Sequence, residues 1–163
     1  MDPFKGDVWK FGDNVDTDVI VPGQYLDAPI TEIFPHVFES INPAFAKEVK
    51  KGDIIVAGKN FGCGSSRENA PSALKEMGIG CIVAESFARI FFRNAVAIGL
   101  PVISCGDVSS RFQDHDHASV NLSKALIENT TRKTVTAANP LSEEMLRIIE
   151  KGGILNLLKE AKE

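Results

Sequence analysis

Cysteines are scarce in this sequence, and no long apolar run occurs in it. The three cysteines, Cys63, Cys81 and Cys105, have no Cys-x-x-Cys spacing, so they indicate neither a disulfide framework nor a complete zinc or iron–sulfur ligand set. No apolar run approaches the roughly 18 residues that cross a bilayer, and the first residues lack the charged-then-apolar layout of a signal peptide. We therefore expect a cytoplasmic protein that has no membrane partner and binds no metal by itself.

Basic tracts are absent as well. The chain has 18 Lys+Arg against 22 Asp+Glu, a formal charge of −4, whereas a nucleic-acid-binding surface needs a Lys/Arg face toward the phosphates. Hydrophobic residues make up 44% and charged residues 25%, which is ordinary for a globular protein and excludes disordered and fibrous classes. The length of 163 residues predicts one domain, residues 1–163, with a proper core and no nucleic-acid partner.

Residues 54–104 carry the clearest pattern of secondary structure. Three continuous apolar runs are typical of strands buried on both faces: residues 54–57, 81–84 and 101–103. Helical periodicity lies between them. The first helix ends at Gly78, and Ser86 is expected to cap a second helix that buries Ile90 and Phe91. Strand, helix, strand, helix, strand predicts an α/β fold with a largely parallel sheet.

The segments on either side are less regular. Three of them are expected to form additional β-strands: residues 7–11, 118–122 and 133–137. We interpret residues 24–35 as a loop, residues 34–40 as a helix and residues 44–50 as a turn. Ser142 is expected to cap the last helix of the chain.

One glycine-rich turn has the residues of a chemical site. Residues 62–68, Gly-Cys-Gly-Ser-Ser-Arg-Glu, join a buried strand to a helix, and α/β folds place ligands at such loops. Unpaired N–H groups, two hydroxyls and the Arg67 guanidinium favour an anion such as a carboxylate. A Walker P-loop is excluded because it needs a lysine, and a dinucleotide fingerprint is excluded because Arg67 stands at its third glycine.

A purely structural explanation of the same turn is equally open. Ser65 and Glu68 have the spacing of a capping box that only starts a helix. Pro71 would then lie inside that helix and remove a backbone hydrogen bond. A helix that begins near residue 69 or 70 fits the proline better, and it leaves both serine hydroxyls free.

Three blocks of sequence resemble one known family. Residues 16–22 (Asp-Thr-Asp-Val-Ile-Val-Pro), 61–68 (Phe-Gly-Cys-Gly-Ser-Ser-Arg-Glu) and 86–94 (Ser-Phe-Ala-Arg-Ile-Phe-Phe-Arg-Asn) occur in that order. Together they closely resemble the small subunits of isopropylmalate dehydratases in the aconitase superfamily. Three ordered blocks are far more specific than any one of them.

The resemblance implies a fold, an activity and a partner. The fold is a three-layer β/β/α swivelling domain, and the partner is a large subunit that holds a [4Fe–4S] cluster. The reaction is the interconversion of 2-isopropylmalate and 3-isopropylmalate by dehydration and rehydration, in leucine biosynthesis. The resemblance makes Ser65 the base, and it makes Ser66 and Arg67 the residues that bind the dicarboxylate substrate. Homo-oligomerisation of the isolated chain stays open.

Substrate choice is expected to depend on one loop: Tyr25, Leu26, Asp27, Ala28, Pro29 and Ile30. Relatives that act on tricarboxylates have an arginine in the corresponding loop, and none occurs here between Gln24 and Phe38. Leu26, Ala28 and Ile30 are candidates to line an apolar pocket for an isopropyl group, although an ordinary surface loop is the alternative. Such a pocket discriminates by only about 1–3 kcal/mol per methylene, so dimethylmalate, citraconate and homoaconitate hydro-lyases stay open.

The resemblance makes five neighbouring residues candidates to orient the serine turn: Asp16, Thr17, Asp18, Cys63 and Gly64. Simple turn chemistry is the favoured explanation for the two aspartates. Cys63 also permits a competing hypothesis, a thiolate nucleophile with one of the histidines, because a thiol pKa falls at a helix entrance.

Other patterns carry less weight. Residues 114–117 (Asp-His-Asp-His) resemble a metal-ligand run, but a solvated loop explains them better. Arg89 and Arg93 are expected to pair with carboxylates. A carboxylate-binding module without catalysis remains the alternative from outside the enzymes.

Overall fold

The computed structural model describes residues 1–162, which contain a seven-stranded sheet of order β4-β3-β2-β1-β5-β6-β7. The strands are β1 (Phe4–Lys10), β2 (Ile54–Ala57), β3 (Cys81–Ala84), β4 (Val102–Ser104), β5 (His117–Asn121), β6 (Leu126–Asn129) and β7 (Thr134–Ala137). β1 to β4 pair in parallel, whereas β5, β6 and β7 extend the sheet as antiparallel neighbours. The predicted α/β class, a parallel sheet with additional strands, is therefore confirmed.

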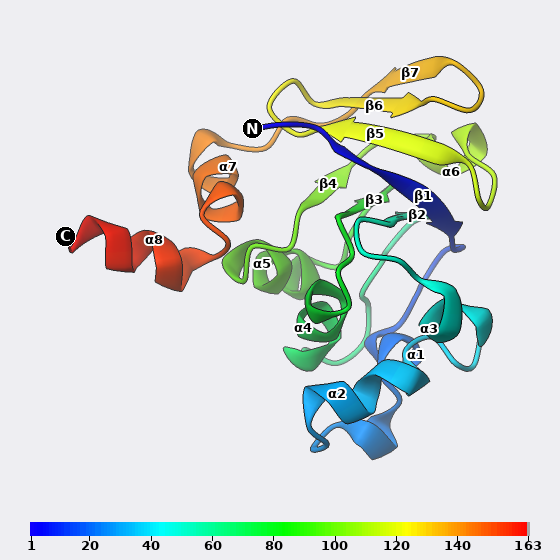
Figure 1. Cartoon of the computed structure of the whole chain (residues 1–163), viewed down its shortest axis with the longest axis vertical. Helices are drawn as coiled ribbons and strands as arrows, with labels where there is room; N and C mark the ends of the chain where they lie inside the picture. Colours follow the sequence, from blue (N-terminus) through cyan, green and yellow to red (C-terminus); the bar gives the residue numbers. More distant parts are fainter. Residues whose placement is uncertain (163) are drawn as a thin grey trace.

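Helices fill the connections. They are α1 (Thr17–Ile20), α2 (Ile30–Ile33), α3 (Ala44–Glu48), α4 (Asn69–Glu76), α5 (Arg89–Ala97), α6 (Val108–Arg111), α7 (Glu143–Glu150) and α8 (Ile154–Ala161), with 3-10 turns η1 (Gly23–Tyr25) and η2 (Phe34–His36). Figure 1 shows the antiparallel strands above the parallel ones and α4 and α5 below them, which gives the three-layer β/β/α arrangement.

The central strands form because their residues suit burial on both faces. All residues of β2 and β3 are buried, and the pairs Ile55↔Ile82 and Val83↔Ile103 stack side chains across the sheet. Parallel strands covered on both faces are built from such apolar runs. The parallel register brings the carboxyl ends of β2 and β3 to one edge of the sheet, where the turns that precede α4 and α5 begin.

Several predicted boundaries are wrong. Helix α5 begins at Arg89, not behind Ser86, because the Ser86 hydroxyl instead accepts a hydrogen bond from the Asn60 N–H at 2.8 Å. Ile90, expected in the core, is 52% exposed. Residues 24–35 contain η1 and α2 rather than only a loop, residues 34–40 form η2 and turns rather than a helix, and α3 replaces the turn expected at 44–50.

The C-terminal part differs from the prediction in one respect. Ser142 caps α7 as expected, since its Oγ accepts a hydrogen bond from the Met145 N–H at 3.2 Å. Helix α7 is not the last helix, because the chain turns at Gly152 and Gly153 and continues as α8. Both glycines have positive φ, and a Cβ on Gly153 would lie 3.1 Å from the Ala97 carbonyl oxygen.

Candidate functional site

The serine turn is held in place by the segment that precedes α1. The Gly62 N–H donates to the Val15 carbonyl at 2.7 Å, and the Thr17 N–H donates to the Cys63 carbonyl at 2.9 Å. The buried Thr17 hydroxyl donates to the Ser65 carbonyl at 2.9 Å. These bonds fix the backbone on both sides of the glycines, although 45 residues or more separate the two segments in the chain.

Two glycines are required by close contacts at this turn. Gly64 has φ +90°, and a Cβ there would lie 2.5 Å from Asp16 Oδ2. Gly62 has φ +81°, and a Cβ there would lie 2.2 Å from the Phe91 ring. A side chain at either position would force the turn off the neighbouring segment, because L-residues resist positive φ and both spaces are filled.

The Ser65 and Ser66 side chains face a cavity. Both residues are exposed, and neither hydroxyl makes a hydrogen bond within residues 1–162. The cavity measures about 240 Å³, and its lining includes Ser65, Ser66, Arg67, Arg89 and Asn94. The two hydroxyls are therefore free to bind a small ligand.

Helix α4 does not use Ser65 as a cap. The helix begins at Asn69, Glu68 stands at the N-cap position, and no side chain caps the first turn. Pro71 lies in that first turn, where the missing N–H costs nothing. The capping-box explanation of Ser65 is wrong, and the predicted start near residue 69 is confirmed.

Arg67 is paired but not locked into the core. Its Nη1 atom is buried and lies against Asp18 Oδ1, in an ion pair that lacks hydrogen-bond geometry. The Arg67 side chain is 20% exposed and that of Asp18 is 57% exposed. A guanidinium held by one solvated carboxylate keeps N–H donors for a second anion.

Asp16 has a local role that the sequence favoured. Its Oδ1 accepts the Asp18 N–H at 2.8 Å and so caps α1. The same side chain contacts the space above Gly64. Asp16 therefore both caps α1 and contacts the serine turn.

Cys63 does not have the environment of a nucleophile. Burial of the thiol and the nearby Asp16 carboxylate raise its pKa above the ordinary value, against a smaller opposing effect of a backbone hydrogen bond. A raised pKa leaves less thiolate at neutral pH. The expected fall of this pKa is wrong, and with it the cysteine-hydrolase hypothesis loses its physical basis.

The expected specificity loop lies beside the site rather than in it. None of residues 25–30 lines the serine cavity. Tyr25, Ala28 and Ile30 are partly buried and pack against the hydrophobic core. The loop is tied to the site through the Leu26 carbonyl, which accepts a hydrogen bond from Asn69 Nδ2 at 3.1 Å.

Helix α5 contributes residues that sequence reasoning missed. Arg89, Ile90 and Asn94 line the serine cavity. Neither Arg89 nor Arg93 makes an ion pair within residues 1–162, so the prediction that they pair with carboxylates is wrong. The available signal was the third sequence block, which contains all of these residues.

Within residues 1–162, no group of three or more His, Cys, Asp or Glu side chains is placed so that it could hold a metal ion. The run at residues 114–117 is dispersed: His117 pairs with Asp7 at 3.1 Å and Asp116 pairs with Arg132 at 2.9 Å. In the same range, no helix is long and apolar enough to cross a membrane.

Known proteins resemble the chain over nearly its whole length. Residues 23–105 match the family model of the aconitase C-terminal domain. The chain is 49% identical over 159 residues to the 3-isopropylmalate dehydratase small subunit of Brachyspira hyodysenteriae, which covers 97% of this chain and 98% of the relative. It is 52% identical over 153 residues to the methanogen homoaconitase small subunit of Methanothermobacter thermautotrophicus, at 93% and 88% coverage.

A solved structure agrees with these relatives. The crystal structure of a 3-isopropylmalate dehydratase from Methanocaldococcus jannaschii has a TM-score of 0.92 at 42% identity, and covers 98% of this chain and 95% of that chain. The fold and the serine turn thus place this chain in the class of aconitase-type domains. Within this class the chain belongs to the family of 3-isopropylmalate dehydratase small subunits. The small-subunit names imply a large-subunit partner.

Proposed function

We propose that the chain is the small subunit of a hydro-lyase that interconverts 2-isopropylmalate and 3-isopropylmalate by dehydration and rehydration, as one step of leucine biosynthesis. The observation that carries the proposal is the pair of free serine hydroxyls beside Arg67 at the cavity. The names of its relatives support the reaction type.

Ser65 is the proposed base. Its Oγ takes the proton from the carbon next to a substrate carboxylate, and it returns a proton during rehydration. An ordinary serine hydroxyl is far too weak a base at neutral pH, so the site must stabilise its alkoxide. Arg67 and Arg89 line the same cavity and supply positive potential for that purpose.

Ser66 and Arg67 are the proposed carboxylate ligands. The guanidinium fork matches a carboxylate in bidentate geometry, and the Ser66 hydroxyl donates a further hydrogen bond. Asp18 competes with the substrate for Arg67, because one exposed carboxylate already lies against the guanidinium. Thr17 and Gly64 position this pair by fixing the backbone of the turn.

The proposed substrate is a branched dicarboxylate. No arginine occurs between Gln24 and Phe38 to meet a third carboxylate, and Ile90 and Phe91 give the cavity an apolar side. A homoaconitase function is the second candidate, because a relative of that name is 52% identical. We also propose that residues 25–30 determine which substrate the enzyme selects.

The proposed partner is a large subunit that carries a [4Fe–4S] cluster. The residues of this chain do not fit such a cluster, since the described part offers no ligand group. We assign residues 1–163 to one swivelling domain that closes on the large subunit. The cytoplasmic location stays a prediction.

Reconstitution tests the function. The purified chain and its large subunit, co-expressed and kept anaerobic, are assayed for hydration and dehydration of isopropylmalate, dimethylmalate, citramalate and homoaconitate. We expect turnover of isopropylmalate with kcat/KM at least about tenfold above the others, and no turnover by this chain alone. Equal kcat/KM for isopropylmalate and homoaconitate contradicts the substrate assignment, and an active single chain contradicts the two-subunit assignment.

A further inference from the structure

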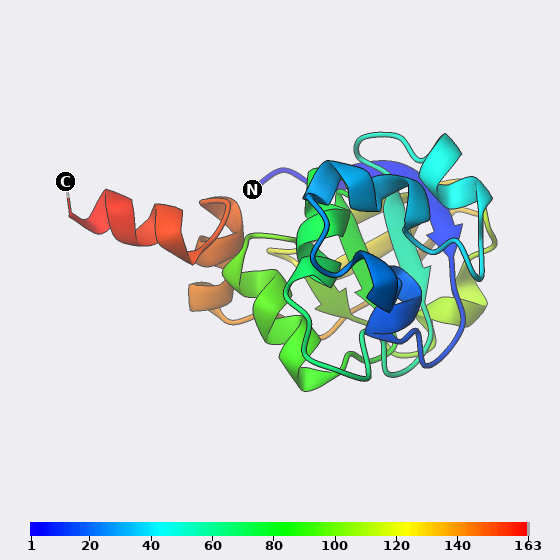
Figure 2. The ribbon, with the colours of Figure 1, turned by 90° about the horizontal axis from the view of Figure 1, so that it is seen from below.

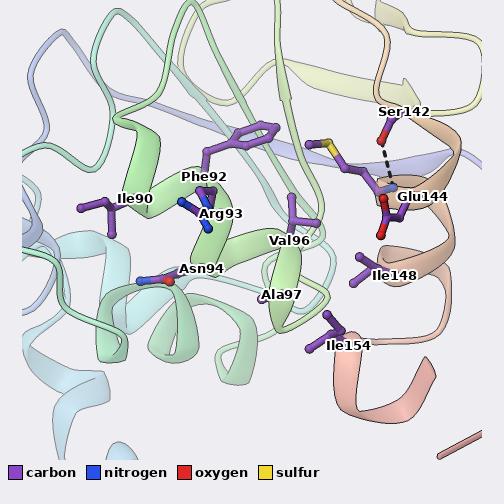
Figure 3. Close-up of a pocket in the computed structure, with 11 residues that line it drawn as sticks. Ile90, Phe92, Arg93, Asn94, Val96, Ala97, Ser142, Glu144, Ile148 and Ile154 are labelled. Carbon is purple, nitrogen blue, oxygen red and sulfur yellow. Dashed lines mark hydrogen bonds between the residues drawn. The ribbon is translucent and has the colours of Figure 1, made fainter. Parts of the chain in front are cut away.

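A second, larger cavity lies next to the serine cavity. It measures about 670 Å³ and is lined by residues of α5 and α7. Figure 3 shows Val96 and Ala97 of α5 facing Ile148 of α7, with Ile154 at the end where α8 begins. Aliphatic side chains thus dominate these walls, so the cavity suits an apolar occupant. We call this cavity the α5–α7 groove.

Helix α8 extends away from the body of the molecule, as Figure 2 shows. The helix buries none of its eight residues, and Leu155 and Leu158 are 71% and 52% exposed. Ile154 and Leu158 are four residues apart, so they share one face of the helix. An eight-residue helix gains too little from its own hydrogen bonds to be stable in water. Exposed aliphatic side chains on such a helix indicate a surface that a partner covers.

The groove is continuous with the candidate active site. Ile90 and Asn94 lie one turn apart on α5, and both line the serine cavity and the α5–α7 groove. Ile90 is 52% exposed. A polypeptide that closes the serine cavity must cover Ile90, and the same surface then continues along α5 into the groove.

We propose that the α5–α7 groove, together with Ile154 and Leu158 of α8, is the docking surface for the large subunit. The inference rests on the proposed function, which requires a second polypeptide at the serine cavity. The partner segment presents aliphatic side chains to the groove. The groove also contains Arg93 and Glu144, and Arg93 makes no ion pair within residues 1–162, so the partner segment presents a carboxylate to Arg93.

A charge placed on α8 tests the surface. Leu158→Glu is compared with Val135→Glu, because Val135 is 59% exposed on β7, at the end of the sheet away from α5. The Kd for the purified large subunit is measured by calorimetry, and turnover is measured against large-subunit concentration. We expect Leu158→Glu to raise Kd at least about tenfold with kcat unchanged at saturation, and Val135→Glu to leave both unchanged.

Other outcomes decide against the surface. An unchanged Kd for Leu158→Glu overturns the proposal, provided circular dichroism shows a folded chain; Leu158→Ser serves as a second variant with a smaller expected rise. If Leu158→Glu instead converts a dimer of the isolated chain to a monomer while Kd for the large subunit stays the same, the occupant is a second copy and the proposal is wrong. Failure of the wild-type complex to act on isopropylmalate overturns the proposed function alone, because Kd still decides the docking surface.

Discussion

The two halves of the sheet use an aspartate and an arginine in opposite ways. In the antiparallel half, Asp116 is 5% exposed and its Oδ2 accepts hydrogen bonds from the Gln113 N–H, Asn129 Nδ2 and Arg132 Nε, each at 2.9 Å. In the parallel half, Asp18 is exposed and pairs with Arg67 without hydrogen-bond geometry.

The comparison shows what separates a structural ion pair from one available to a ligand. The three donors around Asp116 Oδ2 connect the segment before β5 with the turn after β6, so this cluster stabilises the fold. Within residues 1–162 the Arg67 guanidinium has only one carboxylate partner, the exposed Asp18, and it lies at the wall of a cavity, so its other N–H donors remain for a ligand. The same two residue types therefore stabilise the fold in one half and, in the other, leave a guanidinium at a cavity wall where we propose that it binds a carboxylate.

The largest effect is expected from Asp116→Asn. The amide keeps the shape but removes the charge and brings N–H donors toward Asn129 and Arg132. The free energy of unfolding should fall by about 2–3 kcal/mol, measured by urea denaturation at pH 7. Turnover of the reconstituted enzyme should stay unchanged, because the cluster lies outside the serine cavity. If the variant is folded but its enzyme has lost turnover, the Asp116 cluster is not purely structural, and the contrast between the two halves of the sheet is wrong.

The pH dependence of this variant sharpens the same comparison. Burial raises the pKa of Asp116, but hydrogen bonds from Gln113, Asn129 and Arg132 and the Arg132 charge outweigh burial and hold it below the ordinary value. A lowered folded-state pKa gives stability that is complete above the unfolded pKa, near 4, and lost as the pH falls through the folded value. The stability gap between wild type and Asp116→Asn should therefore be constant from pH 7 to about pH 4 and shrink below it. A gap that does not shrink at any pH below about 4 would contradict the charge as its cause.

A smaller effect is expected from Asp18→Asn. The variant removes the competing charge from Arg67, while the backbone N–H that Asp16 caps is retained. KM for isopropylmalate should fall by roughly threefold with kcat nearly unchanged, because exposed ion pairs contribute under about 1 kcal/mol. The difference should diminish in high salt. A rise in KM would instead identify Asp18 as a residue that positions Arg67.

Local patterns predicted the parallel half well. Residues 54–57 and 81–84 are strands as expected, because continuous apolar runs leave few alternatives. The proline in the first turn of α4 also fixed the helix start. Contacts distant in sequence explain why the start of α5 and the burial of Ile90 were predicted wrongly. The Ser86 hydroxyl accepts a hydrogen bond from the Asn60 N–H instead of capping a helix, and Ile90 lines a cavity rather than the core.

The candidate site was predictable in its residues but not in its connections. The sequence identified Ser65, Ser66 and Arg67 as candidates. Thr17 and Asp18 were candidates to orient the turn, but the sequence did not predict which groups they contact. Thr17 bonds the Ser65 carbonyl and Asp18 pairs with Arg67, and both contacts join segments far apart in the chain. The missed strand β6 and the missed helix α8 lack a continuous buried run: β6 alternates exposed and buried residues, and α8 buries none of its residues.

Reconstituted Ser65→Ala enzyme gives the most direct test of the central claim, that a serine of this chain removes the substrate proton. The matched control is Ser72→Ala, whose hydroxyl bonds the Glu68 carbonyl at 2.9 Å and does not line the cavity. The claim predicts that Ser65→Ala binds the large subunit with wild-type Kd and loses turnover of isopropylmalate at least about a thousandfold, while Ser72→Ala keeps it. Near-normal turnover by the Ser65→Ala complex would contradict the claim.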